Sequence, residues 1–170
     1  MSAPHLVIVG EGPERGRLEG LATKLGIGSR VEFLGRLSHE DTLRELSQAT
    51  LLALPSRRTR DGDSDGFANV LTEAMMCGVP IVTTTAAGAG ELLVDGESAL
   101  LVPPDEPQLL AAAIDLLLGN FALQKRLAEN ARRVLETCLD EEVEITKTAN
   151  LIFGNFASQK STPENSKNFG

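Results

Sequence analysis

The chain has 170 residues, of which 42% are hydrophobic and 24% charged, so it is long and apolar enough to build one domain with its own core. The net charge of −8 excludes unaided binding to nucleic acid or to an anionic membrane surface, because both require clustered Lys and Arg. No apolar run approaches the roughly 18 residues of a membrane span, and the first residues do not form a signal peptide. Cys77 and Cys138 fit no metal-ligand spacing, so we expect reduced thiols in a cytoplasmic protein.

Short, continuous apolar runs recur along the chain, and most of them end at Gly or Pro. Runs of this kind are typical of strands that are buried on both faces of a parallel sheet. They predict strands over residues 6–9, 31–34, 51–54, 80–84 and 99–102.

Helical patterns fill the intervals between these strands. Pro13 stands at a tolerated first helical position, and Ser38 stands at an N-cap with Asp41 at the capping-box position. The alternation of strands and helices predicts an α/β fold with a Rossmann-like parallel sheet and helices on both faces. We assign residues 1–153 to this domain and expect the polar tail, 154–170, to be disordered. The predicted helices cover residues 14–25, 39–49, 67–77, 106–118 and 123–138, with a short helix or turn over 89–93 and a weaker helix over 140–153.

In such folds, ligands bind at the carboxyl ends of the strands. The loops that begin at Gly10, Gly35, Pro55 and Thr83 should therefore converge on one rim. The glycines at 10, 12 and 16 resemble a dinucleotide-binding fingerprint, but the third comes one residue late and a proline between them removes a backbone donor. A tight turn that needs no ligand is the favoured interpretation of this segment.

Residues 61–66 carry alternating Asp residues followed by Gly, which matches the first half of a calcium-binding loop. The twelfth position of that loop is Thr72 instead of Glu, and a strand and an Arg cluster precede it where a helix is expected. We therefore favour a solvated loop without a metal. A flexible active-site loop and a small calcium-binding or interaction domain remain the alternatives.

The segment from Asp65 to Pro80 is the most informative part of the chain. Glu73 follows Asp65 after seven residues and lies on an apolar helix, where an unpaired carboxylate would cost free energy. Hydroxyl groups of a ligand could satisfy both carboxylates. The alternative is that Asp65 caps the helix and Glu73 pairs with a buried Lys or Arg. The helix start also offers free backbone N–H groups suited to a diphosphate, which we place at Phe67, Ala68, Asn69 and Val70.

This segment resembles the carboxyl-terminal, donor-binding domain of GT-B glycosyltransferases, in particular the retaining group 1, GT4-like family. The family signature is an acidic residue, seven further residues, then Glu on a Met- and Ala-rich helix that leads into Gly–Val–Pro. Here it starts at Asp65, passes through Glu73 and ends at Gly78–Val79–Pro80. The order and spacing of the motifs agree over residues 5–135. Further matches are found at residues 6–13, 31–35, 54–56, 91–96 and 100–104.

The resemblance implies a hexosyltransferase that moves a sugar from a nucleotide-diphosphate sugar to an acceptor with retention, without a cofactor or a metal. It places Asp65 beside the transferred sugar as the catalytic residue, where the family usually has Glu, and Glu73 on the ribose. The base would lie against Arg36 and Leu37. The remaining binding residues, at the first strand end and at the phosphates or sugar, would be Gly10, Gly66, Phe67, Ala68, Asn69 and Val70.

The resemblance also implies parts that this chain lacks: an amino-terminal acceptor domain, the first strand of this domain, and the Arg and Lys after it. That strand would lie between residues 6–9 and 51–54, so its absence would leave two apolar edges unpaired. We expect one of three outcomes: the edges pair with each other, a second chain supplies the strand or the domain, or the fold is marginally stable. The chain alone should be inactive. The alternative function is a non-catalytic nucleotide- or sugar-phosphate-binding module that acts with a partner chain.

Overall fold

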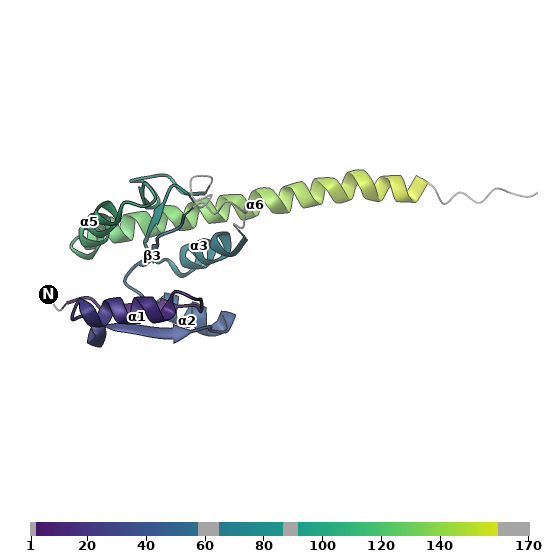
Figure 1. The fold of residues 1–170 in the computed structure, drawn as a ribbon. Helices are drawn as coiled ribbons and strands as arrows, with labels where there is room; N and C mark the ends of the chain where they lie inside the picture. Colours follow the sequence, from purple (N-terminus) through teal and green to yellow (C-terminus); the bar gives the residue numbers. More distant parts are fainter. Residues whose placement is uncertain (1–2, 58–64, 87–91, 160–170) are drawn as a thin grey trace, which may run out of the picture.

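Parallel strands form the framework of the chain, divided between two sheets (Figure 1). The structure is a computed structural model that describes residues 3–57, 65–86 and 92–159, without the side chains of 65–68 and 141–159. Each predicted strand is present within two residues of its expected bounds, which confirms the Rossmann-like α/β class. One sheet pairs β1 (Leu6–Val9) with β2 (Val31–Gly35), and the other has the order β3 (Leu52–Leu54), β4 (Ile81–Thr84), β5 (Leu100–Val102).

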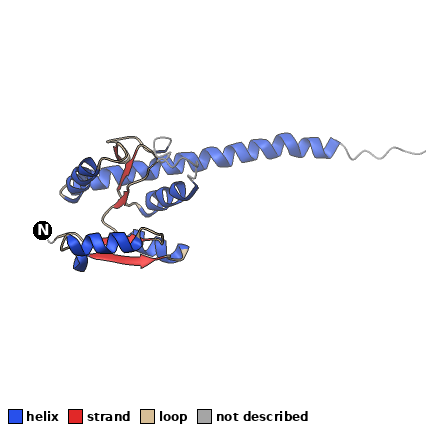
Figure 2. Cartoon of the chain, in the orientation of Figure 1, coloured by secondary structure: helices blue, strands red, loops and turns tan. Residues whose placement is uncertain are grey.

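Helices follow β1, β2, β3 and β5, as the sequence predicts (Figure 2). The predicted short helix or turn over 89–93 begins outside the described residues. Ser38 caps α2 as expected, because the Asp41 N–H donates to its hydroxyl at 3.1 Å. Within the described ranges, no helix is both long enough and apolar enough to cross a membrane. The helices are α1 (Arg15–Lys24), the short 3-10 helix η1 (Gly28–Arg30), α2 (His39–Gln48), α3 (Asp65–Cys77), α5 (Pro107–Leu118) and α6 (Phe121–Gln159).

The last helix differs from the prediction. The sequence predicted separate helices over 123–138 and 140–153, whereas α6 is continuous over 39 residues. The physical reason is that residues 121–153 contain neither Gly nor Pro, so nothing in the sequence stops the helix at residue 139. The helix also continues past the predicted boundary at residue 153 as far as Gln159. The rest of the tail, 160–170, lies outside the described residues.

The core lies on both faces of β4. Its four residues are all buried, and successive side chains alternate between the faces. Ile81 belongs to an α3-side cluster and Val82 to an α5-side cluster, and α6 contributes to both. The α3-side cluster consists of Leu46, Leu71, Ala74, Met75, Val79, Ile81, Leu93, Ala99, Ala131 and Leu135. The α5-side cluster consists of Val82, Val102, Ala113, Leu117 and Leu127.

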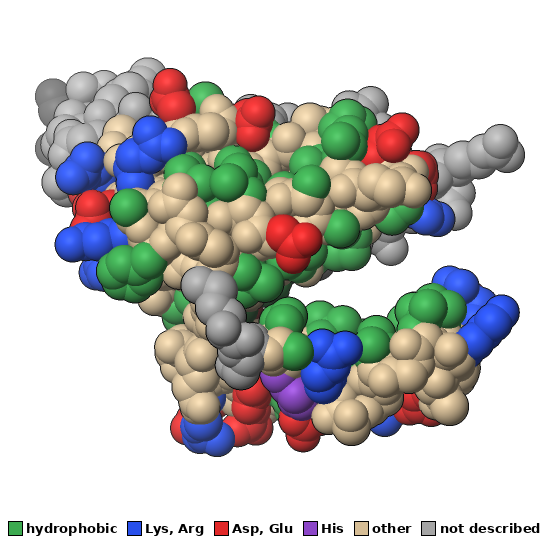
Figure 3. Space-filling model, turned by 90° about the vertical axis from the view of Figure 1, so that its left-hand side faces the viewer, with side chains coloured by type: hydrophobic (Ala, Val, Ile, Leu, Met, Phe, Trp, Pro, Cys, Tyr) green, Lys and Arg blue, Asp and Glu red, His purple; other side chains and the backbone are tan. Residues whose placement is uncertain are grey.

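The two sheets belong to two units that do not pair through their strands. We call β1, α1, η1 and β2 the β1–β2 unit, and β3, α3, β4, β5, α5 and α6 the β3–β5 unit. In the described chain β1 and β3 do not pair, so the first of the three expected outcomes, closure of the two edges on each other, did not occur. Leu6, Val7 and Val9 are 48%, 39% and 42% exposed. Figure 3 shows a hollow between the units with hydrophobic side chains on both walls.

Helix α2 links the two units. It follows β2 in the chain, and its Leu46 is 7% exposed within the α3-side cluster. At the end of α3, the Cys77 thiol lies 4.0 Å from the Leu43 carbonyl oxygen. The contact between α2 and α3 therefore fixes how residues after β2 lie relative to the larger core.

Within the β1–β2 unit, Gly35 closes the turn after β2. Its φ of +70° favours glycine, and its carbonyl accepts the Gly10 N–H at 2.7 Å. The Arg15 guanidinium lies 5.8 Å from the Phe33 ring centre and donates to the Phe33 carbonyl at 3.2 Å. A Cβ on Gly35 would lie 3.4 Å from both Arg15 Nη1 and Glu11 Oε1. These side chains lie at ordinary contact distance, so the left-handed backbone conformation is what disfavours a larger residue in this turn.

The first prediction concerns the core. Leu127 is fully buried in the α5-side cluster, so Leu127→Ala should lower the free energy of unfolding by about 2–5 kcal/mol. Leu116 is 51% exposed on α5, and Leu116→Ala should change the free energy of unfolding by less than about 0.5 kcal/mol. Urea unfolding followed by far-ultraviolet circular dichroism measures both, because the chain has no Trp or Tyr for fluorescence. Equal losses in the two variants would show that the cluster is not a packed core.

The second prediction concerns the Gly35 turn. Gly35→Ala should destabilise the protein by about 1–2 kcal/mol, because alanine pays for the left-handed backbone conformation. Gly20 lies within α1, and a Cβ there meets no atom within 4 Å. Gly20→Ala should therefore stabilise the protein by about 0.5–1 kcal/mol. The same urea titration measures the free energy of unfolding of both variants. A change of the same sign in both would contradict the assigned turn.

Candidate functional site at the carboxyl ends of the strands

The turns after β1 and β2 form one side of the rim. Gly10, which the sequence analysis placed among the ligand-binding residues, uses its N–H in a hydrogen bond to the Gly35 carbonyl. Arg36 follows with an exposed side chain, and Leu37 is half-buried. Their predicted role at the base remains a prediction.

The ends of β3 and β4 are held together by threonine hydroxyls. Thr83 Oγ1 donates to the Leu54 carbonyl at 2.9 Å, and Thr84 Oγ1 donates to the Ser56 carbonyl at 2.6 Å. The Ser56 side chain is only 3% exposed, and its hydroxyl finds no partner among the described residues. The backbone that leads from β3 into the following loop therefore starts from a fixed position beside β4. The candidate calcium loop, 61–66, begins outside the described residues and its side chains are not described.

Helix α3 begins at Asp65, two residues earlier than predicted. Because the N–H groups of the first three helical residues lack an intrahelical acceptor, those of Asp65, Gly66 and Phe67 are available at this end of the helix. The N–H groups of Asn69 and Val70 lie beyond this first turn, and the binding roles predicted for residues 66–70 remain predictions. Asn69 is exposed, and Val70 packs against the α3-side cluster. The side chains of residues 65–68 are not described, so the catalytic role of Asp65 remains a prediction.

Glu73 lies farther along α3 with its side chain 16% exposed. One carboxylate oxygen lies 3.1 Å from Nδ1 of His39, the first residue of α2. The alternative interpretation of the sequence was a buried Lys or Arg as partner, and the observed partner is instead a histidine whose side chain is 72% exposed. Sequence reasoning missed His39. The sequence feature that could have indicated His39 is its position directly after the Ser38 cap, close to the turn after β2.

The arrangement offers two kinds of recognition on one helix. The N-terminus of α3 attracts an anion through its free N–H groups and its dipole. Glu73 lies eight residues later, about 12 Å along the axis at 1.5 Å per residue, and accepts hydrogen bonds. A single extended ligand that carries both an anionic group and hydroxyl groups could contact both. In the described part of the chain, no cluster of three or more His, Cys, Asp or Glu is arranged to hold a metal ion.

Comparison with known proteins shows the same fold in larger enzymes. Sucrose-phosphate synthase from Thermosynechococcus elongatus superposes with a TM-score of 0.73 and 30% identity, over 91% of this chain and 39% of that one. HepE from Anabaena in complex with UDP-glucose superposes with a TM-score of 0.66 and 26% identity, over 85% of this chain and 41% of that one.

Sequence comparison agrees with the structural one. The chain is 39% identical over 128 residues to an exopolysaccharide phosphotransferase of Streptomyces coelicolor, a match that covers 75% of this chain and 13% of that protein. It therefore spans between 13% and 41% of the length of these three proteins. The sequence pattern of the family described as Glycosyl transferases group 1 matches residues 2–134. This match covers well over half of the chain, which belongs to the group 1 glycosyltransferases and has the fold of their GT-B members.

Proposed function

We propose that this chain is the donor-binding half of a glycosyltransferase that transfers a hexosyl group from a nucleotide-diphosphate sugar to an acceptor with retention. The observation that carries the proposal is the combination on α3 of an N-terminus at the rim and Glu73, a mostly buried carboxylate beyond it. Family membership supplies the reaction class. A solved neighbour with UDP-glucose supplies a precedent for the donor class.

In this proposal each end of the site recognises one part of the donor. The first turns of α3, over residues 66–70, meet the diphosphate or the sugar, and Asp65 lies beside the transferred sugar. Glu73 accepts hydrogen bonds from the ribose hydroxyls, which are charge-assisted and therefore strong. Arg36 and Leu37 line the base. The helix dipole stabilises the negative charge that develops on the leaving diphosphate.

The remaining parts of the reaction lie beyond the residues described here. The relatives are more than twice as long as the matched segment, so we assign the acceptor site to a further domain or a second chain. Sugar transfer by these 170 residues alone is not expected. Cys77 and Cys138 are both free thiols, which supports our assignment of the protein to the cytoplasm.

The third prediction tests the donor site by calorimetric titration with UDP, GDP and ADP. One nucleotide should bind, and Glu73→Ala should weaken it at least about tenfold, because two charge-assisted hydrogen bonds are lost. Glu129→Ala is the matched control. Glu129 also lies on a helix and faces a cation, with its carboxylate 3.8 Å from the Lys125 ammonium, but it lies on α6 and is 53% exposed.

The control variant Glu129→Ala should bind the nucleotide as tightly as the wild-type chain does. Both variants should unfold cooperatively, which a thermal scan by circular dichroism checks. Equal affinity of Glu73→Ala and the wild-type chain would remove Glu73 from the ribose site. A folded wild-type chain that binds none of the nucleotides would overturn the proposal for this chain.

A further inference from the structure

We propose that His39 is a positioning residue for Glu73, an inference that rests on the proposed donor site. His39 Nδ1 lies 3.1 Å from Glu73 Oε1, which places the imidazole within ion-pair distance of the carboxylate. The contact joins the first residue of α2 to the third turn of α3. It occupies one carboxylate oxygen and leaves the other to accept hydrogen bonds from a ligand.

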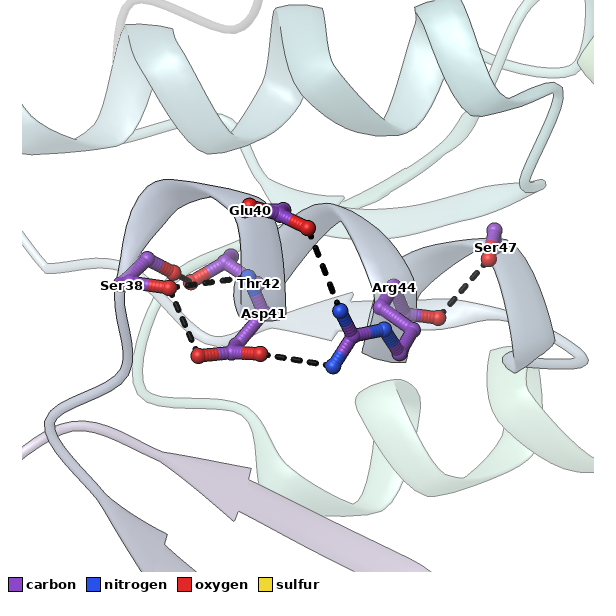
Figure 4. A network of polar contacts seen from close by, with 6 residues as sticks. All are labelled: Ser38, Glu40, Asp41, Thr42, Arg44 and Ser47. Carbon is purple, nitrogen blue, oxygen red and sulfur yellow. Dashed lines mark hydrogen bonds and ion pairs between the residues drawn. The ribbon is translucent and has the colours of Figure 1, made fainter.

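The backbone of His39 is held by the polar network at the start of α2 (Figure 4). The Ser38 hydroxyl accepts the Asp41 N–H at 3.1 Å and donates to Asp41 Oδ2 at 2.7 Å. Thr42 Oγ1 donates to the Ser38 carbonyl at 2.9 Å, and Arg44 lies 2.8 Å from the other Asp41 oxygen. Residues on either side of His39 are thus fixed by interactions within α2, which leaves the imidazole free to face α3.

The backbone of Glu73 is held by packing on the opposite face of its helix. Leu71 and Met75, on either side of it in sequence, are 1% and 0% exposed in the α3-side cluster. Leu46 of α2 lies in the same cluster. The distance between the two helices is therefore set by the core, and the His39–Glu73 contact is made by side chains whose backbones are already in place.

The contact with His39 should lower the entropic cost of ordering Glu73 when a ligand binds. A glutamate side chain has several rotamers, and ordering a flexible side chain upon binding reduces affinity. With one oxygen held by His39, the Glu73 carboxylate is ordered before the ligand arrives. Because His39 is largely exposed, its loss should reduce this order without a large effect on the stability of the fold.

The experiment exploits the geometry of the contact. Asparagine places an amide N–H where the Nδ1 of histidine lies, whereas glutamine places it nearer to Nε2. His39→Asn should therefore retain the wild-type affinity for the ribonucleotide that binds, and His39→Ala and His39→Gln should lower it roughly three- to tenfold. His5→Ala replaces an exposed histidine near the start of the chain and serves as the control.

The second arm compares the ribonucleotide with its 2′,3′-dideoxy analogue. If His39 acts through the ribose contact of Glu73, the affinity for the analogue should be the same in the wild-type chain and in all three His39 variants. A merely structural role would lower both affinities together and would overturn the proposal. Unchanged or tighter ribonucleotide binding by His39→Ala would overturn it as well, because His39 would then be irrelevant to Glu73 or compete with the ligand.

The titrations distinguish failure of the proposed donor site from failure of the role of His39. If the wild-type chain binds no nucleotide, or if Glu73→Ala binds as the wild-type chain does, the proposed function fails and the role of His39 fails with it. If Glu73→Ala loses affinity while His39→Ala does not, only the role of His39 is overturned. Thermal unfolding of each variant accompanies the titrations, and all should melt within a few degrees of the wild-type chain.

Discussion

The double pairing of β4 is the constraint on which the rest of the structure depends. This strand is hydrogen-bonded to β3 on one side and to β5 on the other, and all four of its residues are buried. Because its side chains alternate, one strand serves two clusters of apolar residues, and helices α3 and α5 each require their own face of it. The threonines at its end then fix the backbone after β3, from which the loop to α3 departs.

The candidate site is not contained in this well-packed unit. Glu73 belongs to α3 and is anchored by the core, but the turn at Gly35–Leu37 follows β2, and the β1–β2 unit has little buried apolar surface. Helix α2 is the element that brings the two together, through Leu46 on its core side and His39 at its start. The geometry of the site thus depends on helix packing more than on sheet pairing, because the two sheets do not share a strand edge.

Much of this architecture could be predicted from the residues alone. Continuous apolar runs closed by Gly or Pro predicted the strands within two residues of those observed. The burial on both faces that such runs indicate holds for β4, whereas β1 is mostly exposed. The Ser38 cap could also be predicted, because it depends only on residues that are close together in the sequence. The His39–Glu73 contact could not be predicted in this way, since it depends on how α2 and α3 pack across the core. The sequence predicted two unpaired strand edges but not which of the three outcomes would follow, because strand pairing is decided by the whole fold and not by the strand.

Binding of a ligand across the gap between the two sheets would affect how firmly the two units are held together. A ligand that contacts Glu73 and the Gly35–Leu37 turn at the same time touches both units, so its binding free energy also holds them together. By linkage, a molecule that binds only the joined arrangement stabilises it in proportion to the logarithm of its concentration. The smaller unit, with β1 exposed along its length, would gain most from this bridge. Amide hydrogens of β1 and β2 would then exchange with solvent more slowly in the occupied protein, while those of β4, already enclosed on all sides, would exchange at much the same rate.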